Sequence, residues 1–333
     1  MGIASSGAVS FSDLRTEFVG GSAAISISNL YRGGSHIRTK AANNNGVNLA
    51  ASVPSSGTIN ITNFRGTAKG FRFTFTSGAT NQSAATLFGD DYAVNYRKEI
   101  VIDSGVELGA TSTSEEALEI PSGSSGAIVV TNNGILSGAG GAAGAAGGDA
   151  FETAVACTLI NNGTIRAGGG GGGTGGGGRY SSSSTPYWSG LYQWQSYNAS
   201  PSATGNRQVA KWTNSYVVNS YTTALSMGQY SRSSYVTNSG PIWYFRITRT
   251  TTVNTNGGGG GVGQGYNQSA SSGSGGGTNA GSGGSGASFG SAGSTGVNGN
   301  RTNGSAGGAA GKYIRGISLV SLTDNGSVLG GTA

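Results

Sequence analysis

Glycine clusters in two long tracts of this chain, and these tracts constrain its fold more than any other feature. Of the 65 glycines in the 333-residue sequence, 17 lie in residues 138–178 and 24 in residues 257–316. Within both tracts glycine recurs every third residue, as at Gly138, Gly141 and Gly144. A period of three suits an extended polyproline-II strand, which has three residues per turn and no internal hydrogen bonds. Its N–H and C=O groups must bond to neighbouring strands or to water, so such strands can form a lattice instead of a hydrophobic core.

Two other interpretations of the tracts are a flexible Gly/Ser linker and collagen. Collagen requires abundant proline, and all five prolines lie outside both tracts. The linker interpretation fits less well, because the tracts return repeatedly to β-like sequence. We therefore expect a mainly β protein with little helix, in which short β modules accompany a glycine-rich lattice of the polyproline-II type (polyglycine II) and an aromatic-rich β insertion.

The charges are distributed unevenly. The whole sequence has 19 basic and 13 acidic residues and a net charge of +6, but residues 153–323 contain ten Lys or Arg and no Asp or Glu. This segment is suited to an anionic partner. Its basic residues are sparse for a nucleic-acid patch, and an anionic cell-surface polysaccharide fits at least as well, so we predict no nucleic-acid partner. No apolar run is long enough to cross a membrane, and no membrane insertion is expected.

Three imperfect repeats occupy the start of the chain. They comprise residues 6–15, 22–32 and 56–66. Each alternates apolar with small polar residues and then has Asp or Asn, an apolar residue and an arginine. The alternation indicates a short strand or turn, and Ser10 or Ser12 can cap a short helix through Phe18. Because repeats this short bury little surface alone, residues 1–68 are predicted to attach the chain to a partner; ordinary capped turns in a small domain are the alternative.

A second repeat marks predicted β structure. Residues 69–137 contain short β-branched runs separated by Gly and Ser, which is typical of strands. Asn-Asn-Gly or Asp-Asn-Gly occurs at residues 132–134, 161–163 and 324–326, each time before an apolar residue or a short polar-apolar step. Asn-Gly between apolar segments is a strong tight-turn signal. We expect these units to form β walls from which the glycine strands depart and to which they return.

Half of the aromatic residues lie between the two glycine tracts. Residues 180–245 contain 14 of the 28 aromatics, among them all four tryptophans. Tyr and Trp among Ser and Asn resemble antibody loops, in which rigid rings supply contact area, and the basic residues can pair with phosphate or carboxylate groups. The candidate receptor-binding residues are Trp188, Tyr192, Trp194, Tyr197, Arg207, Lys211, Trp212, Tyr230, Arg232 and Tyr235. The alternative is that the rings form the insertion's own core, with residues 243–245 and 217–218 the best candidates.

The sequence offers little for catalysis. His36 is the single histidine and Cys157 the single cysteine, so a Ser-His-Asp or Cys-His arrangement has only one imidazole to draw on and a zinc site lacks ligands. Glu115, Glu116 and Glu119 are paired carboxylates of the kind a glycosidase uses, but they lie in an acidic loop and the aromatic half has no acid. We predict a protein that is not an enzyme and has no cofactor, metal site or catalytic residue.

Several stretches resemble phage tail proteins. Residues 8–18, AVSFSDLRTEF, followed by LYRGG at residues 30–34, resemble the N-terminal segment of many tailed-phage tail proteins. Residues 100–178, with two Asn-Asn-Gly units and their glycine runs, are similar to glycine-rich minor tail proteins and fibre-tip adhesins. Tip adhesins of T-even-like phages alternate polyglycine-II segments with variable recognition loops, whereas this chain has one long insertion.

The resemblance implies a tail-tip or fibre adhesin in the distal part of the virion tail, which binds a host surface glycan or outer-membrane protein during adsorption. Residues 1–68 would bind other phage tail proteins. A purely structural tail component (a plate, plug or fibre connector) without receptor contact is the alternative. The expected division is 1–68 for attachment, 69–137 a β domain, 138–178 the first glycine tract, 179–256 the aromatic, basic insertion, 257–316 the second tract and 317–333 a C-terminal strand.

Overall fold

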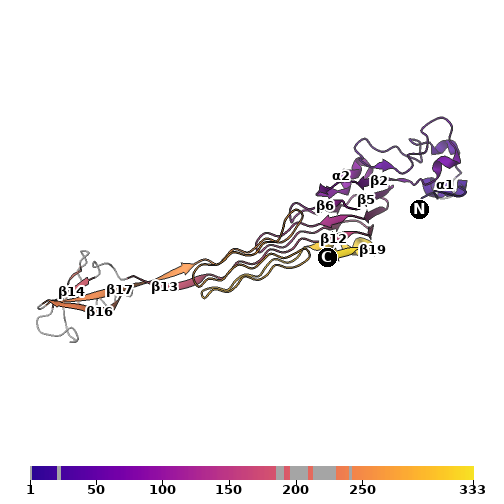
Figure 1. Ribbon diagram of the computed structural model, residues 1–333. Helices are drawn as coiled ribbons and strands as arrows, with labels where there is room; N and C mark the ends of the chain where they lie inside the picture. The colour runs from indigo at the N-terminus through magenta and orange to yellow at the C-terminus, as the bar shows by residue number, and fades with distance from the viewer. Residues whose placement is uncertain (1, 21–23, 185–190, 196–208, 213–229, 240–241) are drawn as a thin grey trace.

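The molecule is elongated, with the N-terminal helices at one end and the strands of the insertion at the other (Figure 1). The computed structural model describes residues 2–20, 24–184, 191–195, 209–212, 230–239 and 242–333. Among these residues there are two short α-helices, α1 (Phe11–Leu14) and α2 (Ala84–Phe88), and most regular structure is strand. The prediction of a mainly β protein with little helix is confirmed.

The three N-terminal repeats fold as single helical turns. They form α1, the 3-10 turn η2 (Ile27–Leu30) and the 3-10 turn η3 (Ile61–Phe64). As predicted, Ser10 caps the first turn: its side chain accepts a hydrogen bond from the Asp13 N–H at 3.2 Å, and the Asp13 carboxylate accepts one from the Ser10 N–H at 2.7 Å. This reciprocal pair is a capping box. The chain continues directly from α1 into the π-helical turn η1 (Arg15–Val19).

Each repeat contributes its last apolar residue to one shared core. Leu14, Leu30 and Phe64 occupy the same position in the three repeats and are all fully buried. Phe18 packs edge-on against Phe64, with ring centroids 5.8 Å apart. Each turn alone is too short to bury much surface, but the three turns pool their side chains with other N-terminal residues in one core, which the sequence did not predict.

Most remaining strands form a three-sided parallel β-solenoid. Successive strands belong to three different sheets in turn, and every pairing between coils is parallel. The first sheet consists of β2 (Gly70–Phe75), β5 (Arg97–Ile102), β8 (Ile128–Asn132), β11 (Cys157–Asn161) and β19 (Val320–Asp324), with β1 (Val47–Asn48) antiparallel at its edge.

The other two sheets have shorter strands. The second contains β3 (Ala79–Thr80), β6 (Glu107–Gly109), β9 (Ile135–Ser137), β12 (Thr164–Arg166) and β20 (Ser327–Leu329). The third contains β4 (Gln82–Ser83), β7 (Leu118–Ile120), β10 (Phe151–Thr153), β18 (Lys312–Arg315) and β21 (Gly331–Thr332). The 3-10 turns η4 (Gly89–Asp91) and η5 (Ile317–Leu319) lie between coils. Strands at residues 151–166 and 312–332 thus share these sheets with residues 70–137.

Apolar side chains stack along the inside of the solenoid from coil to coil. In the second sheet Leu108, Leu136 and Ile165 are in register and fully buried. Repeating one apolar position in each coil buries a continuous core, although no single coil can bury its own apolar face. This arrangement explains how strands as short as three residues form a stable unit.

The Asn-Gly units form a corner of the solenoid. The strands on either side of each unit lie in different sheets, so these are bends between sheets and not hairpin turns. Asn132 donates to the side-chain oxygen of Asn161 at 2.8 Å, and Asn161 donates to Asp324 at the same distance. Asn132 and Asn161 are fully buried. The repeat therefore marks stacked amides that satisfy one another, a ladder also found in other stacked β structures.

The glycine tracts leave the solenoid between its second and third sheets. The chain departs after β9 and returns at β10, and it departs again after β12 and returns only at β18. We call the hydrogen-bonded parts of these excursions, residues 138–148, 168–178 and 257–311, the glycine lattice. It lies between the solenoid and the insertion (Figure 1).

Residues 168–176 form a strand bonded on all sides within the lattice. Consecutive N–H groups of this strand donate to three different segments: Gly169 to Gln264 (2.8 Å), Gly170 to Ser291 (2.9 Å) and Gly171 to Ala145 (2.9 Å). The pattern then repeats after three residues, with Gly172 donating to Gly261 (2.8 Å) and Gly173 to Ser294 (2.9 Å).

The carbonyl groups of the same strand accept from three further segments. Gly169 accepts from Gly141 (2.9 Å), Gly170 from Ala287 (2.9 Å) and Gly171 from Gly308 (2.7 Å). A Cβ atom at Gly169, Gly170 or Gly171 would collide with a neighbouring carbonyl. Glycine is therefore required here by the close approach of backbones, not by an unusual φ angle. Gly144 and Gly290 differ, because both have positive φ, at +74° and +69°.

Candidate functional site

The lattice carries the insertion on two of its strands. Residues 168–178 run out into β13 (Gly178–Ser184), and β17 (Ile242–Thr255) runs back into the second tract. β13 and β17 are antiparallel, with Gly178 opposite Thr255 and Ser184 opposite Arg249. This pair leads to the end of the molecule farthest from α1 (Figure 1). The described strands of the insertion therefore lie at one extremity of the molecule.

The insertion contributes a five-stranded antiparallel sheet. Its other strands are β14 (Leu191–Gln195), β15 (Val209–Trp212) and β16 (Tyr230–Ser239). β14 and β16 both pair with β17, and β15 pairs with β14. Seven of the ten predicted binding residues lie on these strands: Tyr192, Trp194, Lys211, Trp212, Tyr230, Arg232 and Tyr235. Trp188, Tyr197 and Arg207, together with residues 217–218, lie outside the described residues.

The strand register brings distant aromatic positions together. Trp212 is opposite Tyr192, Tyr192 is opposite Phe245, and Phe245 is opposite Tyr235. Trp194, two residues from Tyr192 on β14, is opposite Trp243. Residues in register and residues two apart share one face of a sheet. The register therefore places six aromatic positions from four strands on one face.

A basic pocket lies where the lattice meets β13. It has a volume of about 490 Å³ and is lined by Arg179, Tyr180, Ser181, Asn279, Asn300 and Arg301. Two lattice turns fix the Arg179 backbone: the Asn300 side chain accepts from the Arg179 N–H at 2.7 Å and donates to its carbonyl at 2.8 Å, and Asn279 donates to that carbonyl at 3.1 Å. We did not predict this pocket, because its residues come from three separate stretches of sequence. The carboxylate-free segment was the one signal that pointed to it.

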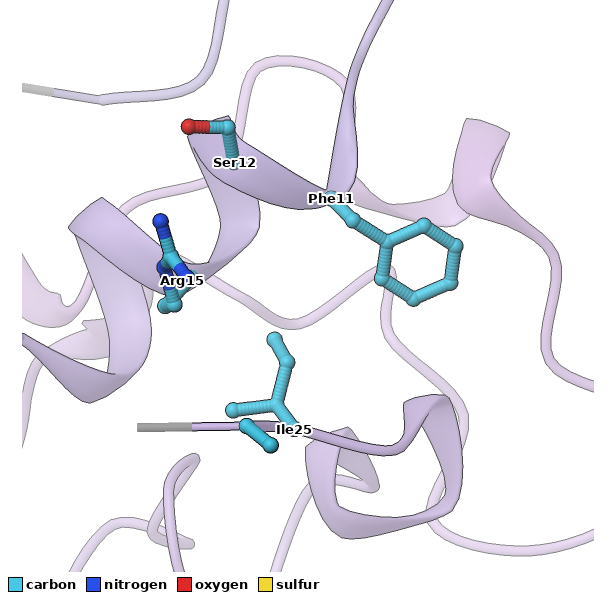
Figure 2. A pocket seen from close by; sticks show the side chains of 5 residues that line it. Phe11, Ser12, Arg15 and Ile25 are labelled. Atoms are coloured by element: carbon cyan, nitrogen blue, oxygen red, sulfur yellow. The ribbon is translucent and has the colours of Figure 1, made fainter. Parts of the chain in front are cut away.

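The N-terminal unit has a pocket of another kind at the opposite end. It has a volume of about 350 Å³ and is lined by Phe11, Ser12, Arg15, Ala24 and Ile25. In Figure 2 Phe11, Ser12 and Arg15 come from the first repeat and Ile25 from the second. Phe11 is 51% exposed, which is unusual for a large apolar side chain. The surface between the first two repeats is therefore mainly apolar, with Ser12 and Arg15 as its polar members.

Cys157 and His36, the residues considered for nucleophilic catalysis, lie in different parts of the described structure. Cys157 is buried inside the solenoid, and burial raises the pKa of its thiol, which disfavours the nucleophilic thiolate. His36 belongs to the N-terminal part of the chain, where its carbonyl accepts from the Tyr96 hydroxyl at 3.2 Å. The described residues contain no group of three metal-binding side chains. None of the described helices is long and apolar enough to span a membrane.

Comparison with known proteins gives a family match over the middle of the chain. The model of the family described as phage tail fibre adhesin Gp38 matches residues 56–240, more than half of the sequence. The crystal structure of the gp37-gp38 adhesin tip complex of the bacteriophage S16 long tail fibre is similar with a TM-score of 0.40 and 15% identity, covering 84% of this chain and 88% of that chain. No curated protein matches the sequence significantly.

Proposed function

Since this chain belongs to the phage tail fibre adhesin Gp38 family, we propose that it binds a host cell-surface receptor through the insertion, residues 179–256, during adsorption. As a family member it is a tail fibre adhesin of the distal virion tail, and we propose that it is not an enzyme. The proposed receptor is a surface polysaccharide or an outer-membrane component. The observation that carries the proposal is the row of aromatic positions that the strand register aligns across the insertion sheet.

The row combines aromatic positions that the sequence analysis assigned partly to receptor binding and partly to the core of the insertion. Tyr192, Trp212 and Tyr235 were candidates for binding, whereas Phe245 was a candidate for core, yet the register puts all four in one row. A continuous aromatic face suits a receptor because ring faces stack on sugars and supply contact area at low entropic cost. We propose Tyr192, Trp194, Trp212 and Tyr235 as the central contacts, with Arg232, which is opposite Ile247, on the same face. Lys211 is opposite Gln193 and therefore belongs to the other face of the sheet.

Phage adsorption tests this proposal. Trp212→Ala removes one central anchor, which typically costs about 2 kcal/mol or more, or roughly thirtyfold in affinity. Adsorption to the native host should fall accordingly while the amount of protein per virion stays normal. Leu329→Ala is the control, because Leu329 is 42% exposed on the solenoid and lies outside the insertion. Unchanged adsorption for Trp212→Ala and also for Trp194→Ala would support a purely structural tail component instead.

We also propose that residues 1–68 attach the chain to other tail proteins. The support is the exposed Phe11 and the apolar pocket beside it, at the end of the molecule opposite the insertion (Figure 1). Deletion of residues 1–66 is a poor test, because the buried Asp91 carboxylate accepts from the Ala41 N–H at 2.6 Å and from Asn44 at 2.9 Å. The deletion would leave that charge without these partners and destabilise the solenoid.

A point variant in the pocket is a cleaner test of attachment. Phe11→Glu places a charge on the apolar surface without removing a buried side chain, so virions should lack the protein although the purified chain folds normally. Val297→Glu makes the same change at another exposed apolar position, 56% exposed in the glycine lattice, and should be incorporated normally. Normal incorporation of Phe11→Glu would place the attachment surface elsewhere.

The glycine lattice is proposed to be of the polyglycine-II type. This proposal is supported by hydrogen bonds that repeat every third residue and connect one strand with six neighbouring segments, since a three-residue period is that of a polyproline-II strand. In this role the lattice is a rigid spacer that holds the insertion away from the solenoid.

A further inference from the structure

The basic pocket at the base of the insertion carries positive charge that no carboxylate among the described residues pairs with. Arg179 and Arg301 both line the pocket. No carboxylate occurs in residues 153–323, and within the described part of the chain neither arginine takes part in an ion pair. By contrast, Arg315, Arg166, Arg72, Arg97 and Arg38 of the solenoid and its surroundings all pair with carboxylates.

The pocket is built on backbone that cannot easily move. The Arg179 N–H and carbonyl are both held by Asn300, and the Arg179 Nε donates to Asn254 at 3.3 Å. The Arg301 N–H donates to the carbonyl of Gly177 at 3.0 Å, inside the lattice. The backbones of Arg179 and Arg301 are therefore anchored to the lattice, and both side chains extend from these anchored positions.

The remaining lining residues suit a sugar. Tyr180 is half-buried and supplies an aromatic ring, and Ser181 is exposed and supplies a hydroxyl group. A phosphate dianion bound by two guanidinium groups is neutralised by short, charge-assisted hydrogen bonds. A single carboxylate carries half that charge and leaves one arginine unneutralised.

We propose that this pocket binds a phosphorylated saccharide of the host surface, with Arg179 and Arg301 on the phosphate and Tyr180 beside the sugar ring. The inference rests on the proposed receptor-binding function, which it deepens by naming a ligand class and a second binding site at the base of the insertion. The pocket lies where lattice turns meet β13, whereas the aromatic positions lie on β14, β15, β16 and β17.

Titration of the full-length protein with defined probes tests the proposal. The probes are glucose 6-phosphate, glucose, glucuronate and inorganic phosphate, monitored through the arginine Nε–H signals in NMR spectra. Glucose 6-phosphate should bind saturably and shift the signals of Arg179 and Arg301. Glucose should produce no shift, and glucuronate and inorganic phosphate should each bind at least threefold more weakly.

Variants assign the binding to the pocket. Arg301→Gln removes an exposed guanidinium and should weaken glucose 6-phosphate binding about tenfold, the effect expected for losing charge-assisted hydrogen bonds. Lys312→Gln also removes one positive charge, but from β18 of the solenoid, and should bind like the wild type. Tyr180→Ala should weaken binding of glucose 6-phosphate but not of inorganic phosphate.

Three outcomes would overturn the inference: no saturable binding of glucose 6-phosphate, equal binding of inorganic phosphate, or unchanged binding by Arg301→Gln. These results are independent of the proposed function, because they are obtained without phage. If Trp212→Ala leaves adsorption unchanged while glucose 6-phosphate still binds to the pocket, the aromatic face is wrong and the pocket stands. If Trp212→Ala reduces adsorption but glucose 6-phosphate does not bind, the proposed aromatic contacts stand and the pocket proposal is wrong.

Discussion

The solenoid excludes water with apolar side chains, whereas the glycine lattice beside it has few side chains to bury. In the solenoid, Leu136 and Ile165 stack between coils and are fully buried. In the lattice, the glycines of residues 168–173 are also buried, but their neighbours are backbone carbonyls and N–H groups. The comparison teaches that one chain can be ordered by side-chain packing in one region and by lateral backbone hydrogen bonds in the next.

The two regions should respond to opposite kinds of substitution, and enlarging a lattice glycine has the largest expected effect. Gly293→Val forces a side chain into the carbonyl of Gly171. The Gly171 backbone is held by lattice hydrogen bonds and cannot move away. We expect a loss of stability of about 3 kcal/mol or more, the upper range for overpacking, measured by denaturant unfolding. Gly275→Val is the control, because a Cβ atom added at this glycine would have no other atom within 4 Å. Equal stability of both variants would contradict the lattice.

Shrinking a side chain should instead damage the solenoid. Leu136→Ala removes a fully buried side chain that is stacked between Leu108 and Ile165. The expected loss is about 3 kcal/mol, within the range for buried leucine. Leu319→Ala, at a position that is 39% exposed, should cost much less. Similar unfolding midpoints for the two variants would show that the solenoid core is not tightly packed.

The amide ladder should respond less than the apolar core. Asn161→Ala removes the acceptor of the Asn132 amide and the donor to Asp324. We expect a loss of about 2 kcal/mol, because the buried Asn132 amide then keeps only its longer hydrogen bond to the Thr164 carbonyl, at 3.2 Å. Asn162→Ala breaks the parallel outer ladder, in which Asn162 donates to Asn133 at 2.9 Å, but those side chains are exposed and the loss should be small. An equal loss for both variants would show that burial does not control the ladder.

The smallest expected effect is a pH dependence on the solenoid's third sheet. Burial, together with a hydrogen bond to Glu152, raises the pKa of Glu116 from 4.5 to about 7. The folded state therefore holds a proton that the unfolded state releases, and this stabilisation is fully present below about pH 4.5 and lost as the pH rises through about 7. Glu116→Gln should flatten the decline in Tm between pH 5 and 8. Glu115→Gln, an exposed neighbour, should keep the wild-type slope; if Glu116→Gln keeps it too, the assignment is wrong.

The sequence predicted features that depend on local chemistry. The capping of α1 by Ser10 followed from residue types a few positions apart. The Asn-Gly repeats predicted tight turns, but not corners between sheets at which Asn132 and Asn161 stack from coil to coil. The sequence did not predict the solenoid. In two of its coils a glycine excursion separates the second-sheet strand from the third-sheet strand that follows it: β9 from β10, and β12 from β18. A short strand followed by a long insertion gives no periodic signal.

At the candidate site, too, the sequence predicted local composition but not the contacts between distant segments. Composition selected the insertion, but the row that joins Tyr192, Trp212 and Tyr235 depends on strand register, which composition does not contain. Arg179 and Arg301 line one pocket only because lattice strands run out and back between them. The three-residue spacing of glycine also did not distinguish lattice strands from turns, because Gly144 follows the spacing but lies at a turn.

Amide hydrogen exchange of the full-length protein tests most directly whether the glycine tracts are ordered by lateral hydrogen bonds. The N–H groups of Gly169, Gly172 and Gly175 donate to neighbouring segments at 2.8 Å. They should be protected to a degree similar to Leu136 and Ile165 in the solenoid, since both regions then open only with global unfolding. The N–H of Gly275, for which no backbone acceptor exists among the described residues, should exchange rapidly. Rapid exchange throughout both tracts would contradict the lattice and return them to flexible linkers.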